Sequence, residues 1–412
     1  MPEQVYAERV LDIGFRPATS LGNETTKIIV ADQGGMVPEL SYRGNNSHWT
    51  PQFRSNSGIP YDAKLHANFW KINLLYHVAG NFPCIPTFGA SEGHEPHGAG
   101  ANKEWKFKGK GVIETANAAY SVSTMEDSST GTHLTYTKYD IVFGGSPTHY
   151  TVLRIKNNDH QKDVKINVAW HNTVGSPFLQ PGNLIDLCAS HYSVPEGFEP
   201  TQLFRGSSSS RYSSLERLPT VDGAIVNARL VRPLDGHTDF IGGAISNGLH
   251  IGWGSVLNPM QQLVYLSFFK GGAAAREKDI ILQFNDLWLQ NGGRPSTPWA
   301  SQEGSTDITY CLGQENAVGF NANGLAASLK TPTFMGNPTT VEIKAQKEKT
   351  LQYGTIFTDT QGKLERGVQR VVRDARGIDV IERETGRYLT VPGDATFANL
   401  DALLPIINEQ IK

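Results

Sequence analysis

Short runs rich in Val, Ile, Thr, Tyr and Phe recur along the chain, and glycine and proline separate them. In the run Val164–Trp170 every second residue is apolar, so the apolar side chains share one face of an extended strand. Many short strands with frequent turn signals are typical of an all-β sandwich or barrel. Long helices do not alternate with the strands, which argues against a TIM barrel or a Rossmann sheet. The other runs of this kind are His133–Phe143, Tyr150–Lys156, Ala224–Val231, Leu263–Phe269, Ile280–Leu289 and Thr340–Lys344.

The pattern becomes helical near the C-terminus. From Phe397 to Ile411 the apolar residues recur every three or four positions, which predicts an amphipathic helix. Thr396 is placed to cap this helix at its start. Pro405 lies inside the segment and is expected to kink or split it, because proline lacks the backbone N–H that a helix interior needs.

The residues between the β-rich part and this helix are mixed in character. The runs Ile378–Glu382 and Tyr388–Val391 flank the turn signal Thr385-Gly386 and predict a hairpin. Lys363–Arg373 is interpreted as a further helix. We therefore expect a β-rich domain over residues 1–359 and a small helical and hairpin extension over residues 360–412 that packs on it.

Composition narrows the classes of partner. The 412 residues carry 37 Lys and Arg against 40 Asp and Glu, a formal net charge of -3, so a nucleic-acid partner is not expected. Met1–Arg9 is polar, no apolar leader follows, and no apolar run of membrane-spanning length occurs, so we expect a soluble, cytoplasmic protein without a membrane partner. Cys84, Cys188 and Cys311 are far apart and odd in number, so we expect reduced, mostly buried thiols.

A first candidate for chemistry is His97. Pro96 precedes it, and Gly98 and Gly100 follow it, which predicts a loop whose backbone approaches a ligand closely. Trp105 lies eight residues further on and would give a flat surface for a sugar ring. His94 and Glu95 next to His97 also permit a metal site, although the HExxH pattern and paired cysteines are absent.

Two later residues are candidates for a general acid and a general base. His171 ends the alternating strand Val164–Trp170, where Asn172 and Thr173 break it, so we expect it at the mouth of a sheet. Glu315 lies in an apolar stretch between two turns of small residues, where loss of water would raise its pKa and suit a general base.

Clusters of aromatic and polar residues elsewhere suit a carbohydrate. Sugars bind through their C–H faces on aromatic rings and through hydroxyls on charged or amide groups. Trp49 and Arg54 belong to one such cluster, His48-Trp49-Thr50-Pro51-Gln52-Phe53-Arg54. Further clusters are Asp286-Leu287-Trp288 and Arg294-Pro295-Ser296-Thr297-Pro298-Trp299.

The ordered set of His97-Gly98 with Trp105, then His171, then Glu315 resembles the aldose 1-epimerase (galactose mutarotase-like) superfamily. The resemblance covers roughly Val30 to Asp359, is strongest around these segments, and extends to Tyr353-Gly354-Thr355-Ile356-Phe357 as a closing strand. It implies a large antiparallel β-supersandwich. It also implies an isomerase that interconverts sugar anomers without a cofactor or metal, as a monomer or homodimer.

The resemblance further implies roles for single residues. Glu315 would be the base at the anomeric hydroxyl, His171 the acid at the ring oxygen, and His97 a group that holds the ring-oxygen side. The expected substrate-binding residues are Trp105, Asp239, Arg54, Trp49 and Arg294.

The sequence also departs from the family pattern. Ala101 stands where the family often has arginine, and Asn172-Thr173-Val174 stands where it often has an aromatic pair. Lys103, Arg54 and Arg294 therefore bring an anionic sugar into consideration. Two alternatives stay open: another sugar isomerase or lyase, with His94, His97, His171 and Glu315 as candidate metal ligands, and a non-catalytic carbohydrate-binding protein.

Overall fold

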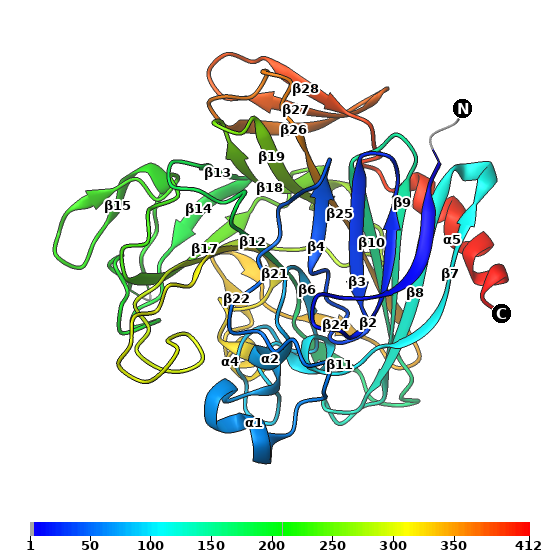
Figure 1. Ribbon diagram of the computed structural model, residues 1–412, viewed down its shortest axis with the longest axis horizontal. Coiled ribbons are helices and arrows are strands. Elements are labelled where there is room, and N and C mark those ends of the chain that lie inside the picture. The colour runs from blue at the N-terminus through cyan, green and yellow to red at the C-terminus, as the bar shows by residue number, and fades with distance from the viewer. Residues whose placement is uncertain (1–3, 208) are drawn as a thin grey trace.

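The computed structural model describes residues 4–207 and 209–412 and consists mainly of antiparallel sheets (Figure 1). Two large sheets pack face to face. The eight-stranded sheet has the order β13 (Leu184–Leu187), β18 (Ile251–Asn258), β19 (Leu263–Lys270), β25 (Glu348–Asp359), β10 (Thr148–Asn157), β9 (Leu134–Phe143), β8 (Ala118–Asp127) and β7 (Lys106–Ile113). The six-stranded sheet has the order β14 (Ala189–Ser193), β17 (His237–Ile245), β20 (Phe284–Asn291), β21 (Tyr310–Val318), β12 (Val168–Gly175) and β6 (Phe82–Cys84). The predicted all-β antiparallel sandwich is confirmed.

The six-stranded sheet has two different faces because side chains alternate along each strand. On β12 the even-numbered residues point toward the eight-stranded sheet. Asn172 is fully buried there, where its amide donates to the hydroxyl of Tyr353 at 2.6 Å and its carbonyl accepts from the hydroxyl of Tyr265 at 2.8 Å. The odd-numbered residues, His171 among them, lie on the opposite face. The polar contacts of Asn172 with the eight-stranded sheet thus hold β12 in place at the residue next to His171.

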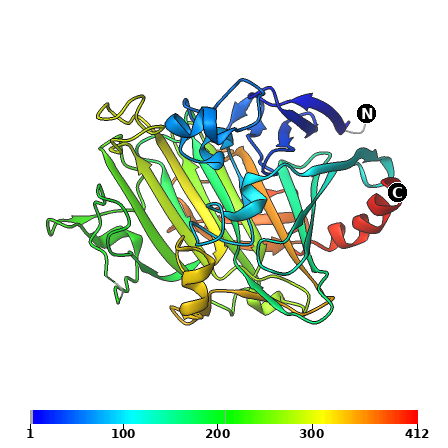
Figure 2. The ribbon, with the colours of Figure 1, turned by 90° about the horizontal axis from the view of Figure 1, so that it is seen from below.

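The outer face of the six-stranded sheet is covered by segments from the first third of the chain and by the loops after β14, β20 and β21 (Figure 2). The helices of this cover are α1 (Ala63–Trp70), α2 (Asn73–His77) and α3 (Gly98–Asn102), and α4 (Gly324–Lys330) follows β21. A five-stranded N-terminal sheet precedes them, with β1 (Tyr6–Leu11), β2 (Pro17–Gly22), β3 (Thr26–Ala31), β4 (Glu39–Tyr42) and β5 (Asn45–Asn46). Small two-stranded sheets pair β11 (Val164–Ile166) with β24 (Val341–Ile343), β15 (Leu218–Pro219) with β16 (Ile225–Val226), and β22 (Thr333–Phe334) with β23 (Asn337–Pro338).

The chain after β25 forms a three-stranded sheet and a helix on the outer side of the eight-stranded sheet (Figure 1). Its elements are β26 (Val368–Asp374), β27 (Gly377–Glu382), β28 (Tyr388–Val391) and α5 (Ala398–Gln410). Leu400, Leu404 and Ile407 of α5 share a buried apolar cluster with Tyr120 and Tyr139 of the large sheet. The predicted hairpin and C-terminal helix are confirmed, and the helix continues through Pro405 without splitting.

One local prediction in this part is wrong, and a second is displaced by one residue. The segment Lys363–Arg373 contains strand β26 and not a helix. A β-bulge between Val368 and Arg370 turns Val368 and Val371 to the same buried side, so a three-residue spacing that imitates a helix belongs to a bulged strand. Phe397 is the N-cap residue of α5, one position after Thr396, whose hydroxyl accepts the backbone N–H of Ala398 at 3.4 Å.

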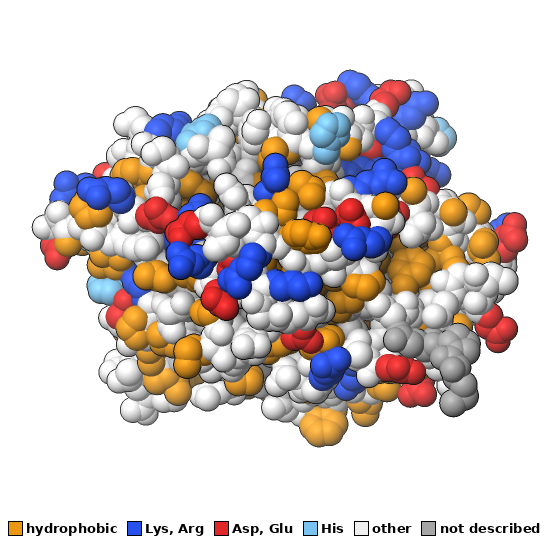
Figure 3. Space-filling model, turned by 90° about the horizontal axis from the view of Figure 1, so that it is seen from above, with side chains coloured by type: hydrophobic (Ala, Val, Ile, Leu, Met, Phe, Trp, Pro, Cys, Tyr) orange, Lys and Arg blue, Asp and Glu red, His pale blue; other side chains and the backbone are white. Residues whose placement is uncertain are grey.

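The surface charges and the state of the cysteines are as the composition predicts. Side chains of both charges are interspersed over the face seen in Figure 3. No helix of residues 4–207 and 209–412 is long and apolar enough to cross a membrane. Cys84, Cys188 and Cys311 are free, as expected, and Cys84 and Cys311 are buried.

Candidate active site

A cavity of about 250 Å³ lies over the outer face of the six-stranded sheet. The sheet forms its floor, and the covering loops and helices form its sides. The side chains that line it are mainly aromatic or aliphatic, with a small ionisable group at the floor. The sheet contributes Phe82, His171, Thr173, Phe240, Trp288 and Glu315, and the cover contributes Trp49, Ile72, Leu74, Leu75, Val78, Gly89, Ala90, Pro96, His97, Phe198, Arg294, Trp299 and Ala322.

His171 and Glu315 contact each other at the floor of this cavity. They are direct partners in the register of β12 and β21, and Nε2 of His171 lies 2.9 Å from Oε1 of Glu315. Both side chains are nearly buried, with 7% and 2% of their surface exposed. The second carboxylate oxygen of Glu315 has no hydrogen-bond partner within the described chain. An acid and a base are therefore held together with one acceptor left free.

The imidazole of His171 is fixed on three sides. Its Nδ1 lies 2.8 Å from the hydroxyl of Thr173, two residues along the same strand. The ring of Phe82 stacks on it with centroids 4.4 Å apart, and Trp288 meets it edge-on at 5.9 Å. A hydroxyl accepts or donates, so Thr173 serves both the neutral ring and the imidazolium. His171 can thus exchange a proton through Nε2 without turning.

His97 lies beside His171 and is held as a neutral donor. The ring centroids of the two histidines are 5.2 Å apart. Nδ1 of His97 accepts the backbone N–H of Gly89 at 3.3 Å and lies 3.2 Å from the sulfur of Cys84. Burial, together with the neighbouring His171, holds the pKa of His97 well below its usual value. The proton of the neutral ring is therefore on Nε2, the nitrogen left to donate to a bound molecule.

A second carboxyl group adjoins Glu315 on its other side. Asp286 of β20 is the register partner of Glu315, is almost fully buried, and accepts the backbone N–H of Gly243 at 3.3 Å. Burial, and then the charge of Glu315, raise the pKa of Asp286 well above its usual range. The protonated form of Asp286 is therefore favoured beside Glu315.

Aromatic rings form a continuous side of the cavity above the acid and base. Trp288 lies 6.3 Å from Trp49 and 6.0 Å from Trp299, centroid to centroid and edge-on in both cases. The guanidinium of Arg294 lies 4.2 Å above the ring of Trp299 and is paired with Glu199 at 2.6 Å. Trp49 and Arg294, both expected to bind substrate, line the cavity, and the charge of Arg294 is paired with that of Glu199.

Three residues expected to bind substrate do not line the cavity. Trp105 has no exposed surface, packs in the core, and donates its indole N–H to the carbonyl of Gly100 at 2.9 Å. Asp239 is fully buried and accepts the backbone N–H groups of Leu203 and Phe204, each at 2.9 Å. Arg54 is buried in an ion pair with Asp12 at 2.6 Å. These side chains support the cover and the loops, and a contact with substrate does not fit their burial.

The local settings of the acid and base also differ from the prediction. His171 lies in the middle of β12, which continues to Gly175, and Glu315 lies in the middle of β21. The predicted strand Val164–Trp170 is divided at Asn167, whose side chain accepts from the N–H of Phe88 and donates to the carbonyl of Thr339. Asn172 and Thr173 therefore lie within β12, on its two opposite faces, and do not mark the end of the strand.

The glycines after His97 have a packing role. A Cβ on Gly98 would lie 2.2 Å from the carbonyl oxygen of Ile85, and one on Gly100 would lie 2.4 Å from the Ile85 side chain. Gly98 also has a φ of 75°, which favours glycine. These glycines bring α3 close to the segment after β6.

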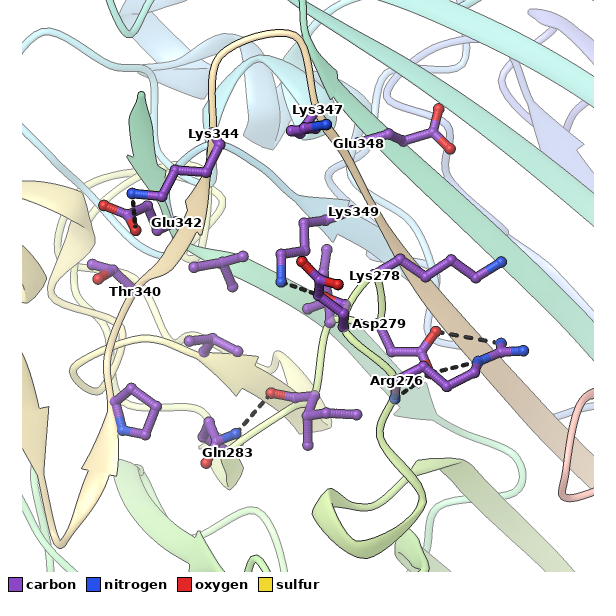
Figure 4. A pocket seen from close by; sticks show the side chains of 16 residues that line it. Arg276, Lys278, Asp279, Gln283, Thr340, Glu342, Lys344, Lys347, Glu348 and Lys349 are labelled. Atoms are coloured by element: carbon purple, nitrogen blue, oxygen red, sulfur yellow. Dashed lines mark hydrogen bonds and ion pairs between the residues drawn. The ribbon is translucent and has the colours of Figure 1, made fainter. Parts of the chain in front are cut away.

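The other predicted groups lie outside the cavity. Neither His94 nor Lys103 lines it. Among residues 4–207 and 209–412, no three His, Cys, Asp or Glu side chains converge as metal ligands. The larger hollow of about 930 Å³ in Figure 4 lies between β24 and residues 276–283, and no histidine or cysteine of residues 4–207 and 209–412 lines it. Several of its charges are paired, as in the contact of Lys344 with Glu342.

Sequence reasoning did not place Thr173 or Phe82 at this site, and it named Asp286 only within a cluster suited to a carbohydrate, not beside Glu315. The position of Thr173 was accessible, because residues two apart on a strand share a face. Phe82 and Asp286 are far from His171 and Glu315 in sequence, and only the pairing of β6 with β12 and of β20 with β21 brings them there.

Solved structures with the galactose mutarotase-like fold are similar to this chain. A Klebsiella pneumoniae protein provisionally named an aldose 1-epimerase has a TM-score of 0.62 and 12% identity, over 84% of this chain and 81% of its own. Galactose mutarotase-like proteins of Clostridium acetobutylicum and Lactobacillus casei have TM-scores of 0.56 and 0.51 and identities of 9% and 12%, over 86% and 83% of this chain and 99% and 100% of theirs. No protein-family model and no curated protein matches the sequence. The chain therefore has the galactose mutarotase-like fold that its motifs implied.

Proposed function

We propose that this protein interconverts the anomers of a neutral sugar by acid–base ring opening, as a mutarotase does. The observation that carries the proposal is the 2.9 Å contact between His171 and Glu315 in an aromatic cavity. The ring oxygen and the anomeric hydroxyl of a sugar are bonded to the same carbon. An acid and a base that serve these two oxygens therefore have to lie side by side, as these two groups do.

The reaction divides between the two groups as the resemblance implies. Glu315 takes the proton of the anomeric hydroxyl while His171 gives its proton to the ring oxygen, and the bond between C1 and the ring oxygen breaks. The open-chain aldehyde then turns about its C1–C2 bond. Ring closure on the other face reverses both proton transfers, so the protein returns to its starting state and no external proton donor is needed.

The groups around the pair support this division of roles. Thr173 accommodates both protonation states of His171, and the raised pKa of Asp286 favours its protonated form beside Glu315. His97 donates from Nε2 toward the ring-oxygen side of the sugar. Its lowered pKa keeps it neutral, so it orients the substrate and does not compete as an acid.

The walls of the cavity favour a neutral sugar over an anionic one. Among the described residues, Arg294 is the one Lys or Arg that lines the cavity, and it is paired with Glu199 at 2.6 Å. Arg54 is paired with Asp12, and Lys103 lies outside the lining. Aromatic rings are the main surface offered, and they suit the C–H faces of an uncharged sugar.

The test is NMR exchange spectroscopy of anomers with neutral, phosphorylated and acidic sugars. We expect faster α/β exchange for a neutral sugar with the wild-type protein and loss of this acceleration in Glu315→Gln. No acceleration for any of the sugars would contradict the proposal. Acceleration confined to a phosphorylated or acidic sugar would contradict the substrate class.

A further inference from the structure

A second hollow adjoins the candidate active site. It has a volume of about 520 Å³ and shares Trp49 and Trp299 with the catalytic cavity. It lies where the segment before α1 meets the loop after β20, two parts of the chain that are neighbours in Figures 1 and 2. Trp49 and Trp299 are therefore the boundary between two adjoining compartments.

The second hollow offers aromatic rings and uncharged polar groups. Phe53 and Tyr310 line it beside the two tryptophans, and the centroids of Phe53 and Trp299 are 5.3 Å apart in an edge-on contact. Gln52 and Thr306 add an amide and a hydroxyl. No Asp, Glu, Lys, Arg or His of the described chain lines it. Rings that accept C–H faces, together with hydroxyl and amide groups, are the chemistry of a neutral sugar site.

The aromatic surface is continuous between the two hollows. Trp288 meets His171 at 5.9 Å and Trp49 at 6.3 Å, and Trp49 meets Phe53 at 6.2 Å. A row of rings thus leads from the catalytic histidine to the second hollow. The catalytic cavity, at about 250 Å³, is smaller than the roughly 300–1,000 Å³ of ordinary ligand pockets, so it suits a single sugar ring.

We propose that the second hollow binds further residues of a neutral oligosaccharide whose reducing-end ring lies at His171 and Glu315. The inference rests on the proposed function, because it assigns that site a longer substrate. The anomeric carbon that reacts belongs to the reducing-end ring. The following residue then leaves the catalytic cavity past Trp49 and Trp299 and enters the second hollow.

The test compares monosaccharides with their oligosaccharides in variants that fill the second hollow. Ser301 lines this hollow and is exposed, so Ser301→Trp fills it without disturbing the core. Gln302 is also exposed but lines neither hollow, so Gln302→Trp is the matched control. The probes are glucose, maltose, maltotriose, cellobiose, cellotriose, galactose and lactose. Exchange spectroscopy measures kcat/KM, and saturation-transfer NMR measures contact with each ring.

We expect kcat/KM for at least one oligosaccharide to exceed that of its monosaccharide by about tenfold, the scale of an added aromatic contact. Ser301→Trp should remove this gain and leave the monosaccharide unchanged, while Gln302→Trp should behave as the wild type. If monosaccharide exchange is accelerated but no oligosaccharide gains, or if Ser301→Trp slows both equally, the inference is wrong and the proposed function stands.

Absence of accelerated anomeric exchange for every sugar would contradict the proposed function. Saturation-transfer NMR would then decide whether the second hollow binds a sugar. Saturation transfer to a second ring that Ser301→Trp abolishes would still support the second hollow as a sugar site. No saturation transfer to any oligosaccharide would overturn it.

Discussion

His171 and Glu315 are direct register partners on β12 and β21, and this pairing sets Nε2 of the first 2.9 Å from Oε1 of the second. Backbone hydrogen bonds of a central sheet therefore fix the distance between acid and base. On the far side of β12, the amide of Asn172 donates to the carbonyl of Gln314 at 2.8 Å and to the hydroxyl of Tyr353 at 2.6 Å. The pair is therefore carried by two central strands of the sheet, and the covering segments add His97 and the aromatic sides of the cavity.

Thr173 is predicted to act on catalysis through His171. Thr173→Val keeps the shape of the side chain and removes the hydroxyl 2.8 Å from Nδ1. A buried nitrogen without its partner costs about 1–3 kcal/mol, so kcat should fall roughly tenfold or more. Steady-state kinetics should show little change in KM, and Thr173→Ser should restore most of the rate. A Thr173→Val protein with wild-type kcat and pH profile would contradict this positioning role.

Asp286 gives the site a predictable dependence of stability on pH. Its pKa is raised in the folded protein, so folding favours its protonated form. The stability that this proton provides is complete below the ordinary Asp pKa and is lost as pH rises toward the raised value. Asp286→Asn removes this loss of stability. The free energy of unfolding of the variant, relative to that of wild type, should therefore increase as pH rises from about 4 to 8. Urea unfolding at both pH values measures it, and a difference that does not change with pH would refute the assignment.

Substitutions of Trp105 and Trp288 are predicted to have different effects, the first on the free energy of unfolding and the second on substrate binding. Trp105→Phe loses the hydrogen bond to Gly100 and part of a fully buried ring, so the free energy of unfolding should fall by about 1–3 kcal/mol with KM unchanged. Trp288→Phe alters the cavity beside His171 and should raise KM roughly two- to tenfold. Thermal unfolding and kinetics on both variants provide the comparison. A raised KM in Trp105→Phe alone would place the sugar elsewhere.

Much of the fold could be predicted from the sequence because strand alternation is a local signal. Val164, Ile166, Val168 and Trp170 are all buried in one cluster, as their spacing indicates. The boundary of that strand was not readable, since Asn167 divides it through contacts with Phe88 and Thr339 that are distant in sequence. The bulge at Val368 likewise depends on the pairing of β26 with β27.

The candidate site was partly predictable for a similar reason. His97, His171 and Glu315 stood out by residue type, order and neighbours, and the cavity brings all three together. Burial was the missing quantity, because a tryptophan eight residues after His97 gives no sign of whether it faces a ligand or the core. Asp239 and Arg54 failed as substrate contacts for the same reason: each is engaged by backbone groups or an opposite charge that the sequence does not place beside it.

The most direct test of the acid–base account is anomeric exchange measured by NMR for wild type, Glu315→Gln and His171→Asn with the preferred neutral sugar. Both substitutions keep the approximate size of the side chain, and thermal unfolding verifies that each variant is folded. We predict that the enzymatic exchange rate falls at least about a hundredfold in each variant, the scale of general acid–base catalysis, while saturation-transfer NMR still detects bound sugar. Wild-type rates in both folded variants would contradict the account.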